Sequence, residues 1–97
     1  MPLTSKQRAK LRALANTTET IFQIGKGGIT DAVVRQTEQA LAARELIKLR
    51  VLESAFMTPR EACNQLCEKL DAEPVQVIGT RFVIYRKDPK EPKIQID

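Results

Sequence analysis

Apolar residues recur along this chain with two spacings, and each spacing predicts a different kind of element. A spacing of three or four residues is typical of a helix with one buried face, whereas alternation of apolar and polar residues is typical of a half-buried strand. Thr37 and Leu41 share one face at the helical spacing, and Ile47 and Leu49 alternate with Lys48. The pattern therefore predicts helices over residues 5–15, 31–44 and 59–70, and strands over residues 20–24, 46–52, 75–78 and 82–85.

Short local signals mark where some of these elements begin and end. Thr58, Pro59 and Glu61 have the spacing of a capping box with proline at the first helical position, which predicts the start of the third helix. Gly79 and Thr80 separate the last two strands, and glycine at the first of these positions suits a type II′ hairpin turn. The order α-β-α-β-α-β-β predicts a compact single α/β domain, with a mixed four-stranded sheet and helices packed on it.

The length of 97 residues allows one hydrophobic core. We expect this domain over residues 1–87 and a flexible charged tail over residues 88–97, because DPKEPKIQID is charged and contains two prolines. The longest uncharged stretch, 74–80, is far shorter than the ~20 apolar residues of a membrane span. The N-terminus also has no apolar run typical of a secretory signal, so we expect a cytoplasmic protein without a membrane partner.

The composition excludes most catalytic and metal chemistry. There is no histidine, and the two cysteines, Cys63 and Cys67, cannot supply the roughly four ligands that zinc requires. Their spacing of four places both thiols on the apolar face of the third helix, so we expect reduced core residues, with a redox pair as the alternative. No carboxylate is paired by spacing with a nucleophile near a candidate site. We therefore expect no enzymatic activity, no cofactor and no metal site.

Charge is distributed unevenly along the chain. Sixteen lysines and arginines against twelve acids give a net charge of +4. Residues 1–30 hold five bases and one acid, and residues 75–87 hold three bases and no acid. Residues 61–74, in contrast, hold one base and four acids. This distribution predicts a molecule with a basic side and a more acidic side, which suits a polyanionic partner such as nucleic acid.

The first predicted helix concentrates four of these bases. Lys6 and Lys10 form one i,i+4 pair, and Arg8 and Arg12 form another, with no acid within the helix to pair with them. Like charges at this spacing repel by roughly 0.2–0.5 kcal/mol per pair, so folding alone does not favour the pattern. A solvated helix face without a ligand is the alternative interpretation.

A glycine-rich loop is the clearest candidate binding motif. Gly25, Lys26, Gly27 and Gly28 lie between a predicted strand and a helix N-terminus, where backbone N–H groups and the helix dipole favour an anion such as phosphate. Glycines are also common in purely structural turns, and that interpretation stays open. A Walker loop and a dinucleotide fingerprint fit the spacing less well. In single-strand RNA modules, a G-x-x-G loop holds the backbone of about four nucleotides.

The aromatic content limits how such a loop would read RNA. The chain has four aromatic residues and no tryptophan, and Phe22 and Phe82 lie in predicted strands, where a core position is expected. A stacking platform built from several rings is therefore not expected. We expect recognition mainly of the RNA backbone and shape, with little base readout.

Four separated blocks of the sequence resemble the CRM domain family (chloroplast RNA splicing and ribosome maturation), in particular its stand-alone bacterial YhbY-like members. The resemblance spans about Leu3 to Lys87, and its blocks are LTSKQRAKLRALA, IFQIGKGGIT, ALAARELIKLRVLE and VQVIGTRFVIYRK. The chain departs from the family pattern in NTTETIFQ, which has no basic residue or histidine, and at Gly27, where a polar residue is frequent.

The resemblance implies a fold similar to the C-terminal domain of translation initiation factor three, and RNA binding through the glycine loop and the neighbouring basic surface. It also implies association with precursors of the large ribosomal subunit. Our main hypothesis is an assembly factor that clamps large-subunit ribosomal RNA, or its precursor, in a pre-ribosomal particle, and we expect a monomer. The candidate RNA-binding residues are Lys6, Arg8, Lys10, Arg12, Gly25, Lys26, Gly27, Gly28, Lys48, Arg50, Arg81, Arg86 and Lys87. The main alternative is a protein-interaction adaptor that docks its basic first helix on a partner, and a small enzyme with a phosphate ligand is a weaker one.

Overall fold

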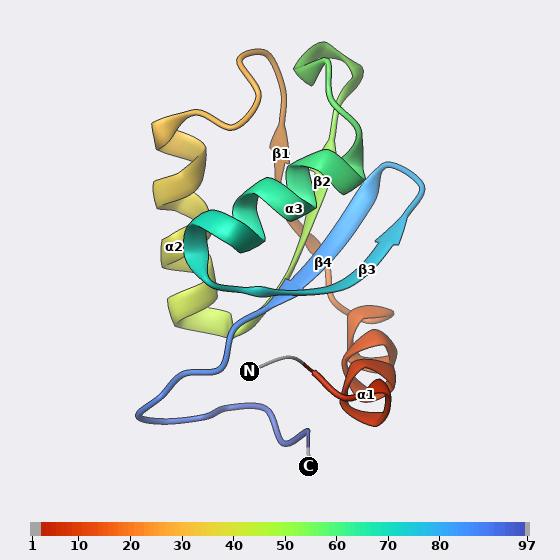
Figure 1. Ribbon diagram of the computed structural model, residues 1–97, viewed down its shortest axis with the longest axis vertical. Helices are drawn as coiled ribbons and strands as arrows, with labels where there is room; N and C mark the ends of the chain where they lie inside the picture. The colour runs from red at the N-terminus through yellow and green to blue at the C-terminus, as the bar shows by residue number, and fades with distance from the viewer. Residues whose placement is uncertain (1–2, 97) are drawn as a thin grey trace.

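The computed structural model describes residues 3–96 and confirms the predicted order of elements (Figure 1). The predicted mixed four-stranded sheet is also confirmed. A short 3-10 helix, η1, was not predicted and follows the second strand. In chain order, the elements are α1 (Ser5–Ala15), β1 (Thr20–Ile24), α2 (Asp31–Arg44), β2 (Leu46–Val51), η1 (Glu53–Ala55), α3 (Pro59–Leu70), β3 (Glu73–Ile78) and β4 (Arg81–Tyr85).

The strand order in the sheet is β1-β2-β4-β3. Strand β1 runs parallel to β2, and β4 runs antiparallel to both of its neighbours. Residues directly opposite each other on paired strands point to the same side of a sheet. Gln23, Arg50, Arg81 and Ile78 are paired in register from one edge to the other, so they form one row across one face.

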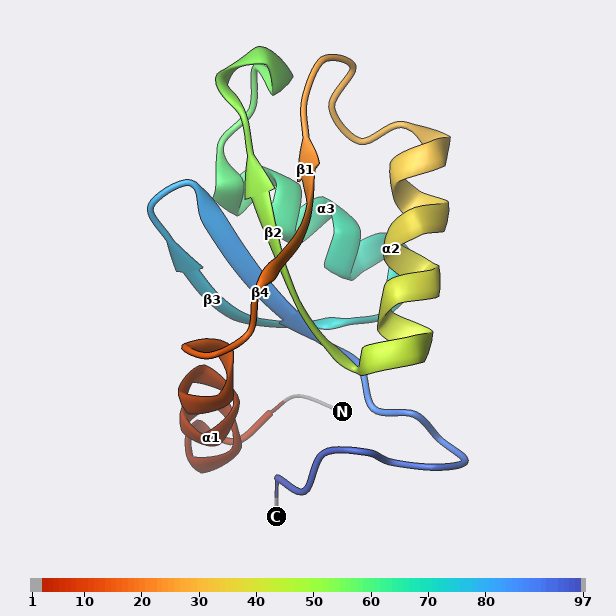
Figure 2. The same ribbon diagram turned by 180° about the vertical axis from the view of Figure 1, so that it is seen from behind.

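Each face of the sheet has its own apolar cluster. Helices α2 and α3 cover one face, where their apolar residues pack with Ile47, Leu49 and Phe82 of the central strands. Helix α1 covers part of the other face, where Leu11 packs with Val83. Figure 2 shows α1 beside the end of the sheet where β1 begins, with no helix over the end where β1 and β2 finish. Part of one sheet face is therefore left for polar side chains.

The two cysteines lie in the core, as predicted from their spacing. Cys63 and Cys67 are free thiols on the buried face of α3. A hydrogen bond between them lowers the pKa of Cys63 and raises that of Cys67, and burial raises the pKa of Cys67 further. Their burial makes them part of the packing between α3 and the sheet.

The predicted capping box at the start of α3 is confirmed. The Thr58 hydroxyl accepts a hydrogen bond from the Glu61 N–H at 3.1 Å, and Glu61 Oε1 accepts one from the Thr58 N–H at 2.8 Å. The bond from the Thr58 backbone is the main reason that the pKa of Glu61 is lowered. This cap determines where the chain leaves the loop after β2 and enters α3.

A buried acid, Glu45, joins α2 to β2. Its backbone has φ 65° and ψ −48°, which is strained for a residue with a side chain. The Glu45 N–H donates to the carbonyl of Leu41 at 2.9 Å, and the Glu45 carbonyl accepts from the Arg86 N–H at 2.9 Å. Its carboxylate is fully buried and accepts backbone N–H groups from Asp88 at 2.6 Å, Lys93 at 2.6 Å and Ile94 at 2.9 Å. Every polar group of Glu45 is therefore engaged.

These bonds hold the segment after β4 against the domain. Ile96 is buried in the cluster beneath α1, and Ile94 packs against the same cluster. The flexibility expected for residues 88–97 stays a prediction, but the described residues 88–96 contact the domain and do not extend away from it. The charged, proline-containing composition gave no indication of these contacts, because they depend on an acid that lies more than forty residues earlier in the chain.

Replacing Glu45 by glutamine is expected to destabilise the protein. The amide nitrogen of Glu45→Gln would face a backbone N–H group on at least one side, and a buried donor without an acceptor costs about 1–3 kcal/mol. Urea unfolding should show a loss of this size, and amide exchange at Asp88, Lys93 and Ile94 should become faster. Glu91→Gln, at an exposed position of the same segment, is the control and should leave both measurements unchanged. Equal unfolding midpoints for the two variants would contradict this account of Glu45.

Candidate nucleic-acid interface

The glycine loop forms a tight turn at the end of β1. The Gly28 N–H donates to the Gly25 carbonyl at 3.0 Å, and Gly27 and Gly28 have positive φ angles of 95° and 64°. Lys26 and Gly27 are exposed at the tip of this turn. Among residues 3–96, the N–H groups of these two residues have no hydrogen-bond acceptor. The tip therefore presents a positive side chain and two free backbone donors, which is the chemistry that binds a phosphate.

The three glycines have different roles. Gly28 is buried, and a Cβ atom at this position would lie 3.5 Å from Met57 Sδ. A Cβ atom at Gly25 would lie 3.5 Å from Ser54 Oγ and 3.6 Å from Leu52 Cδ1. Both glycines thus face the loop after β2, whereas Gly27 is exposed, and a Cβ atom there would lie 3.2 Å from Thr30 Cγ2 of its own loop. Close approach of a ligand backbone is therefore possible at Gly27, and the other two glycines contribute to how the loop packs.

Three basic side chains lie on the sheet face opposite α2 and α3. Lys48, Arg50 and Arg81 form this basic sheet face, and Arg50 lies directly opposite Arg81 on the neighbouring strand. Like charges directly opposite each other destabilise a sheet. Arg81 Nε donates to Thr20 Oγ1 at 3.1 Å, and Arg50 Nε is buried without a hydrogen-bond partner in the described part of the chain. Folding alone does not favour this cluster of cations.

The basic sheet face continues into the glycine loop. Arg50 is paired in register with Gln23, which lies two residues before Gly25. The turn of the β3–β4 hairpin lies beside the C-terminal end of β2, because the Val51 N–H donates to the Thr80 carbonyl at 2.8 Å. Figure 2 shows the glycine loop and the loop after β2 together at one end of the molecule, with this hairpin lower and to the side. The register and this hydrogen bond place the basic sheet face next to these segments.

The basic residues of α1 lie on the same side of the sheet, further from the glycine loop. Lys6, Lys10 and Arg12 are exposed, and Arg8 Nε donates to the Pro74 carbonyl at 3.3 Å. Helix α1 packs on β2 and β3 through the cluster that contains Val83, which is paired in register with Lys48. Helix α1 thus lengthens the basic surface in the direction of the strands.

Two predicted site residues lie apart from this surface. Arg86 and Lys87 follow the end of β4 that is remote from the glycine loop. The Arg86 guanidinium forms an ion pair with Glu38 of α2 and donates to the Leu70 carbonyl at 3.1 Å. Arg86 thus connects α2, α3 and β4, which is a structural use of its charge. Lys87 is exposed beside it.

Some of the exposed acids lie on the side of the sheet that α3 covers. Glu61, Glu68 and Asp71 are exposed on or just after α3, which covers the face opposite the basic sheet face. Residues 3–96 contain no group of three or more histidines, cysteines or acids placed to hold a metal ion. No helix in the described range is long and apolar enough to cross a membrane. The expected division into a basic and a more acidic side stays a prediction, because α2 and α3 also carry the exposed bases Arg35, Arg44, Arg60 and Lys69.

The loop after β2 is a part of this surface that the sequence patterns did not identify. Residues 53–57 include Phe56, whose side chain is 94% exposed. The only signal in the sequence is an aromatic residue that fits neither the strand alternation before it nor the helical spacing after it. The sequence alone does not distinguish such a residue from one that is buried in a small cluster within the loop. Only the fold shows that Phe56 is exposed to solvent.

The sheet, its basic face and the exposed glycine turn define a small α/β protein with a surface suited to a polyanion. Residues 3–86 match the family model of the CRS1/YhbY (CRM) domain. The chain therefore belongs to this family, and the resemblance found in its sequence is confirmed.

Relatives of similar length are known in several bacteria. The chain is 36% identical over 94 residues to the probable RNA-binding protein YqeI of Bacillus subtilis, covering 97% of this chain and 98% of the relative. It is 34% identical over 94 residues to an RNA-binding protein of Haemophilus influenzae, covering 97% and 94%. The solution structure of the hypothetical protein SAV1595 from Staphylococcus aureus, described as a candidate RNA-binding protein, matches with a TM-score of 0.78 and 39% identity over 98% of this chain and 99% of that one.

Alanine substitutions should separate the roles of the glycines. Gly27→Ala and Gly28→Ala place a side chain at a positive φ, which costs about 1–2 kcal/mol, and thermal unfolding should show the loss as a lower Tm. Gly25→Ala should change stability by less than about 0.5 kcal/mol, because its new methyl group meets neighbours at ordinary contact distance. A Gly25→Ala variant that is as unstable as Gly28→Ala would contradict the assigned packing.

Proposed function

We propose that this protein is a non-enzymatic RNA-binding protein that holds the sugar–phosphate backbone on its glycine loop and basic sheet face. The observation that carries the proposal is the continuity of Lys26 and its free backbone donors with Lys48, Arg50 and Arg81. None of these four cations forms an ion pair with an acid of residues 3–96. Their charge is therefore available to an external polyanion.

RNA is the polyanion that the comparisons favour. The relatives from Bacillus subtilis and Haemophilus influenzae are named as RNA-binding proteins, and neither name describes an enzyme. The glycine turn at the end of a strand also matches the G-x-x-G loops that hold the backbone of about four nucleotides in single-strand RNA modules. A row of cations beside such a loop lengthens the contact with phosphates, so affinity should depend steeply on salt.

The more specific part of the proposal concerns the RNA itself. We propose that the ligand is large-subunit ribosomal RNA or its precursor, and that the protein acts as a monomeric assembly factor on pre-ribosomal particles in the cytoplasm. The family resemblance supports this choice, since it implies ribosome maturation. The folded RNA of a ribosomal precursor also offers the combination of closely spaced phosphates and unpaired segments that this surface fits.

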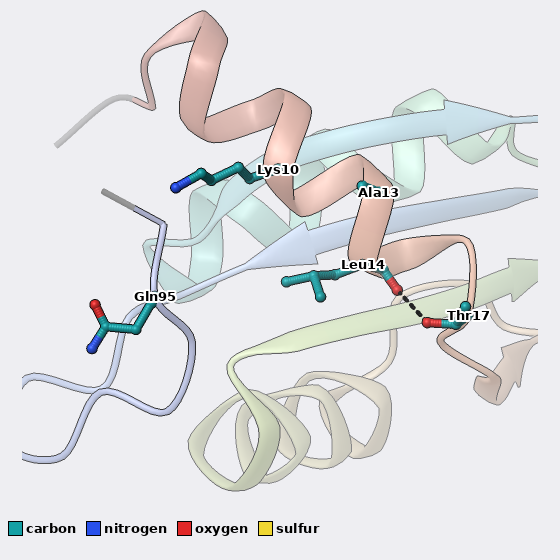
Figure 3. Close-up of a pocket in the computed structure, with 5 residues that line it drawn as sticks. All are labelled: Lys10, Ala13, Leu14, Thr17 and Gln95. Carbon is teal, nitrogen blue, oxygen red and sulfur yellow. Dashed lines mark hydrogen bonds between the residues drawn. The ribbon is translucent and has the colours of Figure 1, made fainter.

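A second candidate function, a protein-interaction adaptor, is favoured by a groove beside α1. Figure 3 shows this shallow groove, of about 320 Å³, between α1 and the segment after β4. Leu14 lies in it with 43% of its surface exposed. An exposed leucine next to a basic helix suits a protein partner with an acidic rim. The groove is lined by Lys10, Ala13, Leu14, Thr17 and Gln95.

Charge reversal at the proposed surface should weaken RNA binding. Lys26→Glu and Arg81→Glu each remove a cation and add a repulsive charge, so the Kd for ribosomal RNA fragments should rise by at least about tenfold. For the neutral variant Lys26→Gln, the slope of log K against log salt should become shallower by roughly 0.7–0.9. Fluorescence anisotropy titrations at several salt concentrations measure both effects.

Lys69→Glu is the matched control for these variants. Lys69 is exposed on α3, on the side of the sheet opposite the basic sheet face, so its reversal changes net charge by the same amount at a remote place. Its RNA affinity should stay within about twofold of wild type, since charges beyond a Debye length of ~8–10 Å are largely screened. If Lys69→Glu and Lys26→Glu weaken binding equally, the surface assigned here is wrong.

Crosslinking in growing cells should identify the biological RNA. A tagged wild-type protein, crosslinked and sedimented through a ribosome gradient, should enrich large-subunit RNA in the precursor fractions, and the Lys26→Glu variant should lose this enrichment. Diverse transcripts in place of ribosomal RNA would leave RNA binding intact and remove the assembly role. Loss of association in a Lys6→Glu/Lys10→Glu variant, together with unchanged RNA affinity in vitro, would favour the adaptor.

A further inference from the structure

Phe56 occupies a position that folding alone does not explain. Its side chain is 94% exposed, although burial of a phenylalanine normally stabilises a fold. It also has φ 53° and ψ 38°, the left-handed conformation in which glycine or asparagine is usual at the end of a helix. The Phe56 N–H donates to the Glu53 carbonyl at 3.0 Å, so this conformation is held by the turn. Such strain in an exposed aromatic residue points to a use outside the fold.

The residues on either side hold Phe56 in place. Ala55 and Met57 both pack against the core cluster beneath α2 and α3, and the left-handed turn between them directs Phe56 outward. The Ala55 N–H donates to the Leu52 carbonyl at 3.0 Å, and the Leu52 N–H donates to the Ile24 carbonyl at 2.9 Å. The loop is therefore tied to the end of β1, and the backbone at Phe56 has a defined position.

This position is next to the glycine loop. The Cβ position of Gly28 lies 3.5 Å from Met57 Sδ and 3.8 Å from the Ala55 carbonyl oxygen, the two neighbours of Phe56 in the chain. Figure 1 shows the two loops side by side at one end of the molecule, and Figure 2 shows the same from behind. The exposed residues Lys26, Gly27 and Phe56 thus lie on two loops that contact each other.

We propose that Phe56 stacks on an unpaired base of the RNA whose backbone lies on the glycine loop. This inference rests on the proposed function and specifies its ligand, which must include a single-stranded segment at this end of the protein. A lone aromatic ring beside a cationic turn fits a polymer that combines flat bases with negative phosphates. One acid, Glu53, is exposed in the same turn, and Lys26 and Arg60 are exposed cations of the two neighbouring segments.

Stacking on one ring is compatible with recognition of backbone and shape. Every base has an aromatic face, so stacking distinguishes an unpaired base from a paired one without selecting its identity. The chain has too few aromatic residues for a platform of several rings, and Phe56 alone would supply this contact. The expectation of little base readout therefore changes in one respect, because the protein would detect whether a base is free.

The Phe56→Trp variant provides a direct test, because the chain contains no other tryptophan. Its fluorescence should be quenched when an oligoadenylate of about ten nucleotides is added, since tryptophan keeps the stacking surface. An oligomer of the same length with abasic riboses carries the same phosphates and should leave the fluorescence unchanged. Quenching that is equal for the two oligomers would overturn the inference.

Affinity measurements with Phe56→Asn complete the test. Asparagine tolerates the left-handed conformation, so the Tm should stay the same or rise. The Kd for oligoadenylate should increase by about 5- to 150-fold, which corresponds to the loss of one stacked base, and the Kd for the abasic oligomer should not change. Leu14→Gln, an exposed apolar residue of α1, is the control and should bind both oligomers as wild type does.

The outcomes separate this inference from the proposed function. If Lys26→Glu weakens binding of both oligomers while Phe56→Asn binds oligoadenylate as tightly as wild type, stacking is overturned and backbone binding stands. If the wild-type protein binds neither oligomer at low salt, both are overturned. A fluorescence change of Phe56→Trp with vesicles of anionic phospholipid, and none with oligoadenylate, would also overturn stacking and assign the exposed ring to a lipid surface.

Discussion

The change of direction between α2 and β2 takes place at one residue, Glu45, and the arrangement of the sheet depends on it. Its strained backbone ends the helix and starts the strand without a loop, so the first residue of β2 is set at Leu46. A shift by one residue would exchange the two faces of β2. The same residue binds the segment after β4 through three backbone hydrogen bonds, and this brings Ile96 into the cluster beneath α1. Through its backbone and its carboxylate, Glu45 thus connects a helix, a central strand and the segment after β4.

The two faces of β2 carry different kinds of side chain. Ile47, Leu49 and Val51 join the core beneath α2 and α3, whereas Lys48 and Arg50 lie on the other face. Folding alone does not favour Arg50, since it lies opposite Arg81 and its Nε has no partner in the described range. Conflicts of this kind between local preference and fold are expected at functional surfaces. The repulsion between Arg50 and Arg81 remains in the folded protein, and a bound polyanion would reduce it.

The two loops at the end of the sheet also combine residues that pack inside with residues that are exposed. Gly25 and Gly28 serve the packing of one loop on the other, and this packing leaves Lys26 and Gly27 exposed at the tip. The loop after β2 buries Ala55 and Met57 and leaves Phe56 outside. Rigid loops that expose a few chosen groups lose little conformational entropy on binding, so the free energy of their contacts is retained.

Local patterns in the sequence were sufficient for the type and order of the α-helices and strands, because periodicity, capping boxes and turn residues act over a few positions. The glycine motif was visible for the same reason, since its residues are contiguous. The strand order and register, in contrast, decided which basic residues share a surface. They placed Arg50 opposite Arg81 on the neighbouring strand, and they placed Arg86 beside Glu38 and away from the glycine loop. The exposure of Phe56 and the burial of Glu45 were likewise settled only by tertiary structure, because both depend on contacts between segments that are distant in the chain and that no local pattern encodes.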